Sequence, residues 1–229
     1  MDRSGITMGS LDDLLPLATP TADQPLAGLT LLLVEDSRLA SEGMRLLCRR
    51  SGARLRRADS LAAAERHLRG YRPDAAMVDL HLPDGSGLDL LARLAAARPR
   101  LDVLVALTGD PDSADAALAA GADAVLLKPL GLAAFQSALL AHLPAHRQPP
   151  ARRPVPAAEP SPDPRALRED LEHAAALLGQ DPAPFDYVRR FVTGVARSAG
   201  DRALAQAAHL GARPLAQALH DRLSRPAAL

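Results

Sequence analysis

The chain contains one lysine, one cysteine and few aromatic residues. The first two shortages bear on the chemistry that the chain can support. Of its 27 basic residues only Lys128 is a lysine. Because arginine serves everywhere else, a retained lysine suggests a need for a compact ammonium group, which a planar guanidinium does not imitate. The single cysteine, Cys48, excludes an internal disulfide and a cysteine-based zinc site. It lies in a helical pattern beside Met44 and Leu47, which predicts a buried, unreactive thiol.

Long hydrophobic runs and an excess of one charge are also missing. No apolar stretch reaches the roughly 18 residues needed to span a bilayer, and the N-terminus lacks the basic start and apolar region of a secretory signal. The formal net charge is zero, which gives no overall attraction to nucleic acid or to an anionic membrane. We therefore expect a cytoplasmic protein with no membrane association.

Residues 27–144 alternate between two kinds of pattern. Five short apolar runs are separated by five segments of helical periodicity, which predicts a five-stranded doubly wound parallel sheet with helices on both faces, an α/β fold. The expected strands are 29–34, 53–58, 74–79, 102–107 and 123–127, and the expected helices are 37–50, 60–70, 87–98, 112–120 and 131–143. Residues 1–26, which mix Thr, Pro, Asp and Gly, are predicted to be a flexible tail.

A proline-rich stretch divides the chain. Residues 144–164 hold eight prolines, a density that helices and central strands do not tolerate, so 145–163 are predicted to be an extended linker. Residues 164–229 show helical patterns only, beginning at Asp163 and Pro164, a good cap and first-turn pair. We expect a small all-α domain here, as an antiparallel bundle or a dimerising hairpin.

Polar side chains follow four of the five predicted strands. Glu35 and Asp36 follow the first, Asp79 ends the third, and Thr108 and Lys128 follow the fourth and fifth. In an open parallel sheet these strand ends share one edge, where ligands bind. Crowded carboxylates repel one another unless a cation joins them, and an all-oxygen donor set favours Mg²⁺. With a hydroxyl and an ammonium across the pocket, the arrangement favours phosphoryl transfer to Asp79 as the nucleophile.

Residues 28–144 resemble a response-regulator receiver domain of bacterial two-component signalling, whose fold is flavodoxin-like. The resemblance rests on the acidic pair after strand one, Asp79 at the end of strand three, Thr108 after strand four and Lys128-Pro129 after strand five. It implies that Asp79 accepts phosphate from a histidine kinase or phosphotransfer protein. It further implies that Asp36, Asp79 and the backbone carbonyl of His81 bind Mg²⁺, with Glu35 acting through water. Thr108 and Lys128 would hold the phosphoryl oxygens, and the Lys128–Pro129 bond would be cis.

One position departs from the family pattern. The family usually has Tyr or Phe three residues before the lysine, and this chain has Val125. The usual inward swing of an aromatic ring cannot operate, so we expect phosphorylation to be read through the loop after Thr108 and the neighbouring helix surface.

Several outputs are open for the C-terminal helices, which resemble no family. A DNA-binding helix-turn-helix is an alternative, but its apolar spacing fails at Gln217 and His220, and residues 160–229 carry nine arginines against eight acids. A phosphotransfer bundle would need a cation near its histidine, and His173 is followed by Ala-Ala-Ala-Leu-Leu-Gly. We therefore expect a protein-interaction or dimerisation module, which leaves a homodimer open and does not favour nucleic acid.

The sequence thus predicts a response regulator that catalyses only its own phosphorylation and is otherwise no enzyme. A DNA-binding transcriptional regulator and a phosphate-sink receiver without an output are the alternatives.

Overall fold

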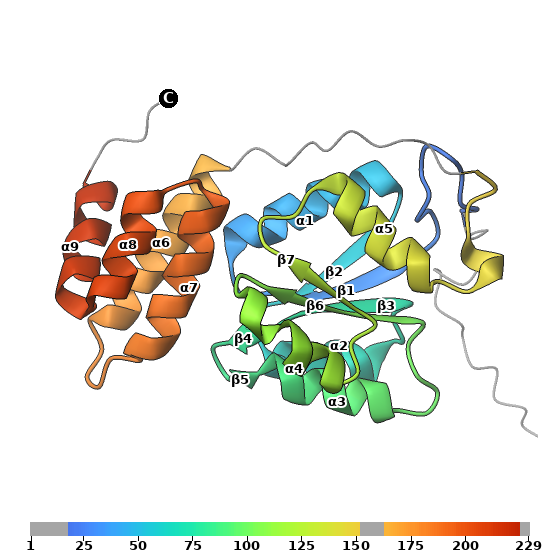
Figure 1. Cartoon of the computed structure of the whole chain (residues 1–229), viewed down its shortest axis with the longest axis horizontal. Coiled ribbons are helices and arrows are strands. Elements are labelled where there is room, and N and C mark those ends of the chain that lie inside the picture. Colours follow the sequence, from blue (N-terminus) through green and yellow to red (C-terminus); the bar gives the residue numbers. More distant parts are fainter. Residues whose placement is uncertain (1–17, 152–162, 225–229) are drawn as a thin grey trace, which may run out of the picture.

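A computed structural model describes residues 18–151 and 163–224 (Figure 1). These residues form an α/β domain and, beside it, a group of four helices. No helix in these two ranges is long and apolar enough to cross a membrane.

The predicted parallel sheet is present. Its strands have the order β2-β1-β3-β6-β7, and every neighbouring pair is parallel. Residues in β3 and β6 are buried throughout, as expected for central strands covered on both faces. The strand bounds are β1 Thr30–Val34, β2 Arg54–Ala58, β3 Ala75–Asp79, β6 Val103–Thr108 and β7 Ala124–Leu127.

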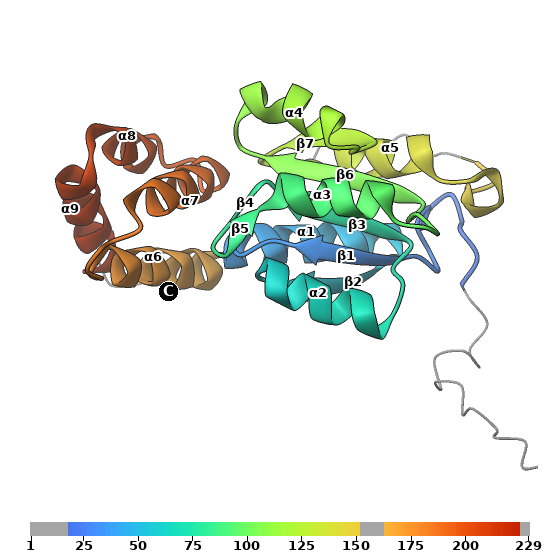
Figure 2. The same ribbon diagram turned by 90° about the horizontal axis from the view of Figure 1, so that it is seen from below.

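Helices cover both faces of the sheet, as the doubly wound prediction requires (Figure 2). One apolar core lies under α1 (Arg38–Ser51) and α5 (Leu132–His142). A second lies on the opposite face under α2 (Leu61–Gly70), α3 (Gly87–Ala96) and α4 (Ala114–Ala119). Between β3 and α3 the chain also forms a short antiparallel pair, β4 (His81–Leu82) and β5 (Gly85–Ser86), which the sequence patterns did not predict.

Serine side chains begin three of these helices. Ser37, Ser60 and Ser86 accept hydrogen bonds from backbone N–H groups in the first turns of α1, α2 and α3. The acidic pair Glu35–Asp36 therefore lies in the tight connection between β1 and a capped helix.

The C-terminal helices form a helical module, defined as α6 (Pro164–Leu178), α7 (Phe185–Ser198), α8 (Arg202–Leu210) and α9 (Ala212–Leu223). Asp163 caps α6 by accepting hydrogen bonds from the amides of Arg165 and Ala166, as predicted. The apolar core of the module includes Leu171, Val188, Val192, Leu204 and Leu215. It also includes Leu39 from α1, so the module packs directly on the α/β domain.

The domain bounds drawn from the sequence need adjustment at both ends of the α/β domain. Residues 1–17 of the predicted tail lie outside the described part, but Leu26 is fully buried in the sheet core, so packing begins before residue 27. Arg147, in the predicted linker, forms an ion pair with Asp74. Residues 152–162 of that linker lie outside the described ranges.

Cys48 is buried, and burial raises the pKa of its thiol to about 12. The prediction of a buried thiol is therefore confirmed.

Candidate functional site

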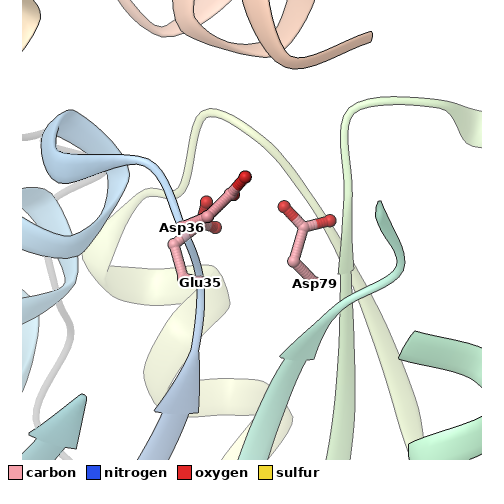
Figure 3. Close-up of side chains that lie close together, drawn as sticks. All are labelled: Glu35, Asp36 and Asp79. Carbon is pink, nitrogen blue, oxygen red and sulfur yellow. The ribbon is translucent and has the colours of Figure 1, made fainter. Parts of the chain in front are cut away.

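Three carboxylates meet at the carboxyl edge of the sheet. Glu35 and Asp36 follow β1, and Asp79 ends the neighbouring strand β3. One oxygen from each lies within 4.8 Å of the others. Figure 3 shows the three side chains turned toward one another, with the ribbon of the helical module passing above them. The predicted acidic cluster is thus formed.

Lys128 joins this cluster from β7. Its Nζ atom lies 2.6 Å from Asp79 Oδ2 and forms an ion pair with Glu35 Oε2. The Lys128 side chain is only 11% exposed and that of Glu35 only 1%, so the charges are largely removed from water. The Lys128–Pro129 bond is cis, as the resemblance implies.

Burial sets the proton affinities of these groups. Burial raises the pKa of Glu35 to about 8; the Lys128 charge opposes that shift, and Asp79 and Asp36 add to it. Burial also raises the pKa of Asp36. For Lys128, burial favours the neutral amine, but the Asp79 and Glu35 charges outweigh it and raise the Lys128 pKa above its ordinary value. The ammonium is therefore held charged between two acids.

His81 and Thr108 lie beside this cluster in different ways. The backbone N–H of His81 donates to Asp79 Oδ1 over 3.1 Å. The Thr108 hydroxyl is fully buried and is bonded to the next loop, where it accepts from the amide of Asp110 over 3.0 Å. The same hydroxyl donates to the Asp110 carbonyl over 3.3 Å, and it would have to give up that bond to donate to a phosphoryl group on Asp79.

Val125 stands where the resemblance expects an aromatic ring. It is half-buried and packs against the core that lies under α2, α3 and α4. The hypothesis that the loop after Thr108 carries the phosphorylation signal stays a prediction.

The donor set suits a hard divalent cation. All three ligand candidates are carboxylates, and the buried Glu35 Oε2 is in contact with the Lys128 ammonium. A single ammonium cannot neutralise three adjacent carboxylates, so the site is left with excess negative charge. The cluster could therefore bind a metal ion.

The helical module adds residues that sequence reasoning missed. The Tyr187 hydroxyl of α7 donates a hydrogen bond to Asp36 Oδ2, and the Arg197 guanidinium donates to the carbonyl of Gly109. Burial and the nearby Asp36 charge raise the pKa of Tyr187. A cleft of about 540 Å³ between the two domains is lined by Asp36, Asp79 and His81 on one side and by Arg190 and Arg197 on the other. No local pattern in the sequence marks these α7 residues as neighbours of the acidic cluster.

Gly87 has no side chain, which allows its backbone to pass close to the carbonyl group of Asp79. A Cβ atom at this position would lie 1.9 Å from the carbonyl oxygen of Asp79. We expect Gly87→Ala to lower the free energy of unfolding by about 2 kcal/mol, because backbone must shift to relieve the contact. Urea denaturation measures this. Gly70→Ala is the matched control, since a Cβ there meets nothing within 4 Å; equal stability losses for the two variants would contradict the close approach.

Comparison with known proteins places this geometry in a family. The model of the response regulator receiver domain family matches residues 31–140. The chain is 34% identical over 104 residues to the probable transcriptional regulatory protein TcrX of Mycobacterium tuberculosis, covering 45% of this chain and 44% of TcrX. It is 36% identical over 100 residues to the virulence transcriptional regulatory protein PhoP of Salmonella typhimurium, covering 43% and 44% of the two chains. The matches therefore span less than half the length of these curated relatives.

Two solved structures are similar to about half of this chain. A response regulator structure from Chloroflexus aurantiacus is 32% identical, covers 49% of this chain and 98% of its own, and gives a TM-score of 0.46. The receiver domain of the sensor histidine kinase PA1611 from Pseudomonas aeruginosa, described with magnesium in its active-site cleft, is 28% identical in sequence. It covers 51% of this chain and 98% of its own, with a TM-score of 0.46. From the match over residues 31–140, together with the strand order and the acidic cluster at the strand ends, we conclude that this part of the chain is a response regulator receiver domain.

Proposed function

We propose that the chain is the response regulator of a two-component phosphorelay and that Asp79 accepts its phosphoryl group. The observation that carries this proposal is the convergence of Glu35, Asp36, Asp79 and Lys128 at the carboxyl edge of a receiver sheet. The donor would be a phosphohistidine on a histidine kinase or on a phosphotransfer protein.

The proposed reaction is a displacement at phosphorus. A carboxylate oxygen of Asp79 forms the new P–O bond while the N–P bond of the phosphohistidine breaks, and the imidazole nitrogen leaves with the electron pair. Lys128 and, after reorientation, Thr108 would hold the phosphoryl oxygens. Lys128 is already placed for this, with Nζ 2.6 Å from Asp79 Oδ2.

Mg²⁺ is the proposed cofactor, held by Asp36, Asp79 and the His81 carbonyl, with Glu35 acting through water. When bound, it would neutralise charge on the phosphoryl oxygens. This role is self-modification, and we propose no metabolic reaction for the chain. The proposed location is the cytoplasm.

A phosphotransfer assay tests the proposal. A histidine kinase is labelled with radioactive ATP, freed of nucleotide and mixed with the full chain, with Mg²⁺ or with excess chelator. Label should move to this chain in the presence of Mg²⁺ and stay on the kinase when the metal is chelated. Transfer at equal rates in both conditions would contradict the proposed metal site, and no transfer from any donor would contradict the acceptor role.

Metal binding should depend on pH. Because burial raises the pKa of Glu35 to about 8, the fraction of Glu35 that carries a proton falls as pH rises toward 8, and a cation must displace that proton. We expect Mg²⁺ affinity to increase between about pH 6 and pH 8, by up to about tenfold per unit. Calorimetric titration at several pH values measures it. An affinity independent of pH across this range would show that no cluster proton is displaced.

The helical module is proposed to bind a protein target under control of the receiver. The transcriptional regulators TcrX and PhoP keep DNA binding open as a second candidate, although their matches cover only the receiver part. Salt-dependent affinity for duplex DNA would favour that candidate. A phosphate sink predicts instead that deleting residues 150–229 leaves the biological output unchanged. Homodimerisation through the helices is part of the same proposal.

A further inference from the structure

A buried carboxylate of the helical module caps a receiver helix. Asp170 of α6 is 2% exposed, yet it accepts hydrogen bonds from Ser37 Oγ over 2.8 Å and from the backbone amides of Arg38 and Leu39 over 2.7 and 3.1 Å. These amides open α1, immediately after Glu35 and Asp36. A buried carboxylate is costly unless it is fully hydrogen-bonded, so this interface is specific to the receiver surface it meets.

Apolar packing supports the same docking. Leu39 of α1 is 5% exposed and belongs to the apolar core of the module, together with Leu171 of α6 and Phe191 of α7. The module therefore rests on the first turn of α1 through both polar and apolar contacts.

One face of α7 is then directed at the acidic cluster. Tyr187, Arg190, Gly194 and Arg197 follow one another at intervals of three, four and three residues, which places them on a single stripe of the helix. Tyr187 bonds Asp36, and Arg197 bonds the Gly109 carbonyl after β6. Two arginines of the stripe thus line the acidic cleft, which makes the two surfaces complementary in charge.

The Tyr187 contact has a direct consequence for metal binding. Mg²⁺ retains several waters in an octahedral shell and needs free space and free lone pairs at Asp36. In this structure a phenol hydroxyl bonds one oxygen of Asp36, and the ring, stacked on Phe191 at 5.9 Å between centroids, lies beside it. The Tyr187 hydroxyl therefore occupies one of the Asp36 oxygens that a hydrated cation would use.

We propose that the α6–α7 face of the helical module docks on the metal-free phosphoacceptor site, with Tyr187 bonded to Asp36 in place of Mg²⁺. Docking of the module and binding of Mg²⁺ then oppose each other, and the coupling is reciprocal: the module weakens metal binding, and metal binding loosens the module. The inference rests on the proposed function, since it names the regulation of the same site.

The two tyrosines of the chain, Tyr71 and Tyr187, and the absence of tryptophan give a direct readout. A Tyr71→Phe variant leaves Tyr187 as the sole fluorophore, and a phenol bonded to a carboxylate is quenched. Adding Mg²⁺ to this variant of the full chain should raise tyrosine emission in a saturable way, as Tyr187 leaves Asp36. Emission unchanged at saturating Mg²⁺ would overturn the proposal.

Calorimetry gives the matching affinity. We expect Tyr187→Phe, which keeps the ring and removes the hydroxyl, to bind Mg²⁺ roughly tenfold more tightly than the wild type. Tyr71→Phe is the matched control and should bind as the wild type does, because Tyr71 bonds His67 away from the cluster. Asp170→Asn, which weakens the cap on α1, should also tighten Mg²⁺ binding, and the double variant should gain less than the product of the single effects.

The outcomes separate this inference from the proposed function. If the wild type takes up Mg²⁺ and phosphoryl groups but Tyr187→Phe binds Mg²⁺ as weakly as the wild type, the competition is refuted and the receiver function stands. If neither the wild type nor Tyr187→Phe nor Asp170→Asn binds Mg²⁺, the competition and the proposed metal site are both refuted.

Discussion

Replacing Asp79 with asparagine is expected to lower phosphoryl transfer to this chain by at least about 100-fold, because an amide cannot supply the attacking oxygen. Folding should be preserved. The side chain keeps its shape, and removing one of three adjacent negative charges relieves repulsion with Glu35 and Asp36. Radioactive transfer from a labelled histidine kinase measures the loss.

Asp84→Asn is the matched control for that experiment. Asp84 is another carboxylate near the end of β3, but it accepts hydrogen bonds from the Leu61 and Ala62 amides at the start of α2. Labelling of Asp84→Asn should equal that of the wild type. Similar labelling of Asp79→Asn and the wild type would contradict the acceptor assignment.

Replacing Lys128 with methionine should have the next largest effect, on both stability and chemistry. It leaves Glu35 and Asp79 buried without their shared cation. Removing one partner of a buried ion pair typically costs about 3 kcal/mol or more, so we expect a loss of that order in the free energy of unfolding at neutral pH. Phosphoryl transfer should fall as well, because no ammonium remains to hold the phosphoryl oxygens.

The stability loss in Lys128→Met should depend on pH in a defined direction. Burial raises the pKa of Glu35, and without the ammonium that opposes this shift the folded protein binds more protons than the unfolded chain. The free energy of unfolding therefore falls as pH rises from about 5 to about 8, more steeply than in the wild type. Urea denaturation across this range measures it.

Lys128→Arg separates charge from shape. It keeps the positive charge, so its stability should follow the pH dependence of the wild type, while the planar guanidinium should impair transfer. Stability curves for Lys128→Met that coincide with those of the wild type at every pH would show that the ion pair does not support the fold.

Local patterns were sufficient for the receiver fold. Buried strands such as β3 and β6 are nearly all apolar and are separated by segments of helical periodicity, so the alternation of strand and helix can be followed along the chain. The β4–β5 pair escaped because each strand has two residues and no period to detect. Leu26 escaped because it lies between Pro25 and Gly28, before the regular apolar run that begins at Leu29.

The acidic cluster was also predictable, for a geometric reason. Parallel strands end at one edge, so residues that follow β1, β3 and β7 must meet there, as Glu35, Asp79 and Lys128 do. The orientation of Thr108 was not predictable, since its hydroxyl can bond either the loop or a phosphoryl group.

The contacts between the two domains lay beyond sequence reasoning. In the sequence, Asp170 is one of several acidic residues on an amphipathic helix, and Tyr187 belongs to an apolar stripe with Val188 and Phe191. Their partners Ser37 and Asp36 lie 133 and 151 residues away along the chain, and only the folded arrangement brings each pair into contact. Docking depends on two complementary surfaces at once, and a pattern within one segment cannot describe both.

Contacts between the helical module and the receiver offer a route for a phosphorylation signal that does not depend on an aromatic side chain at position 125. The α7 stripe touches Asp36 and the Gly109 carbonyl, which follow β1 and β6. Metal or phosphoryl binding at the cluster would therefore act on the helical module directly, through contacts already made.

The assignment of Asp79 is tested most directly by locating the phosphoryl group in the wild-type chain. After transfer from a labelled kinase with Mg²⁺, the acyl phosphate is trapped by borohydride reduction, and the modified residue is identified by peptide mass spectrometry. The reduced product should be found at Asp79 and should be absent when chelator replaces Mg²⁺. Modification at Glu35, Asp36 or a histidine of the helical module, with Asp79 intact, would contradict the account.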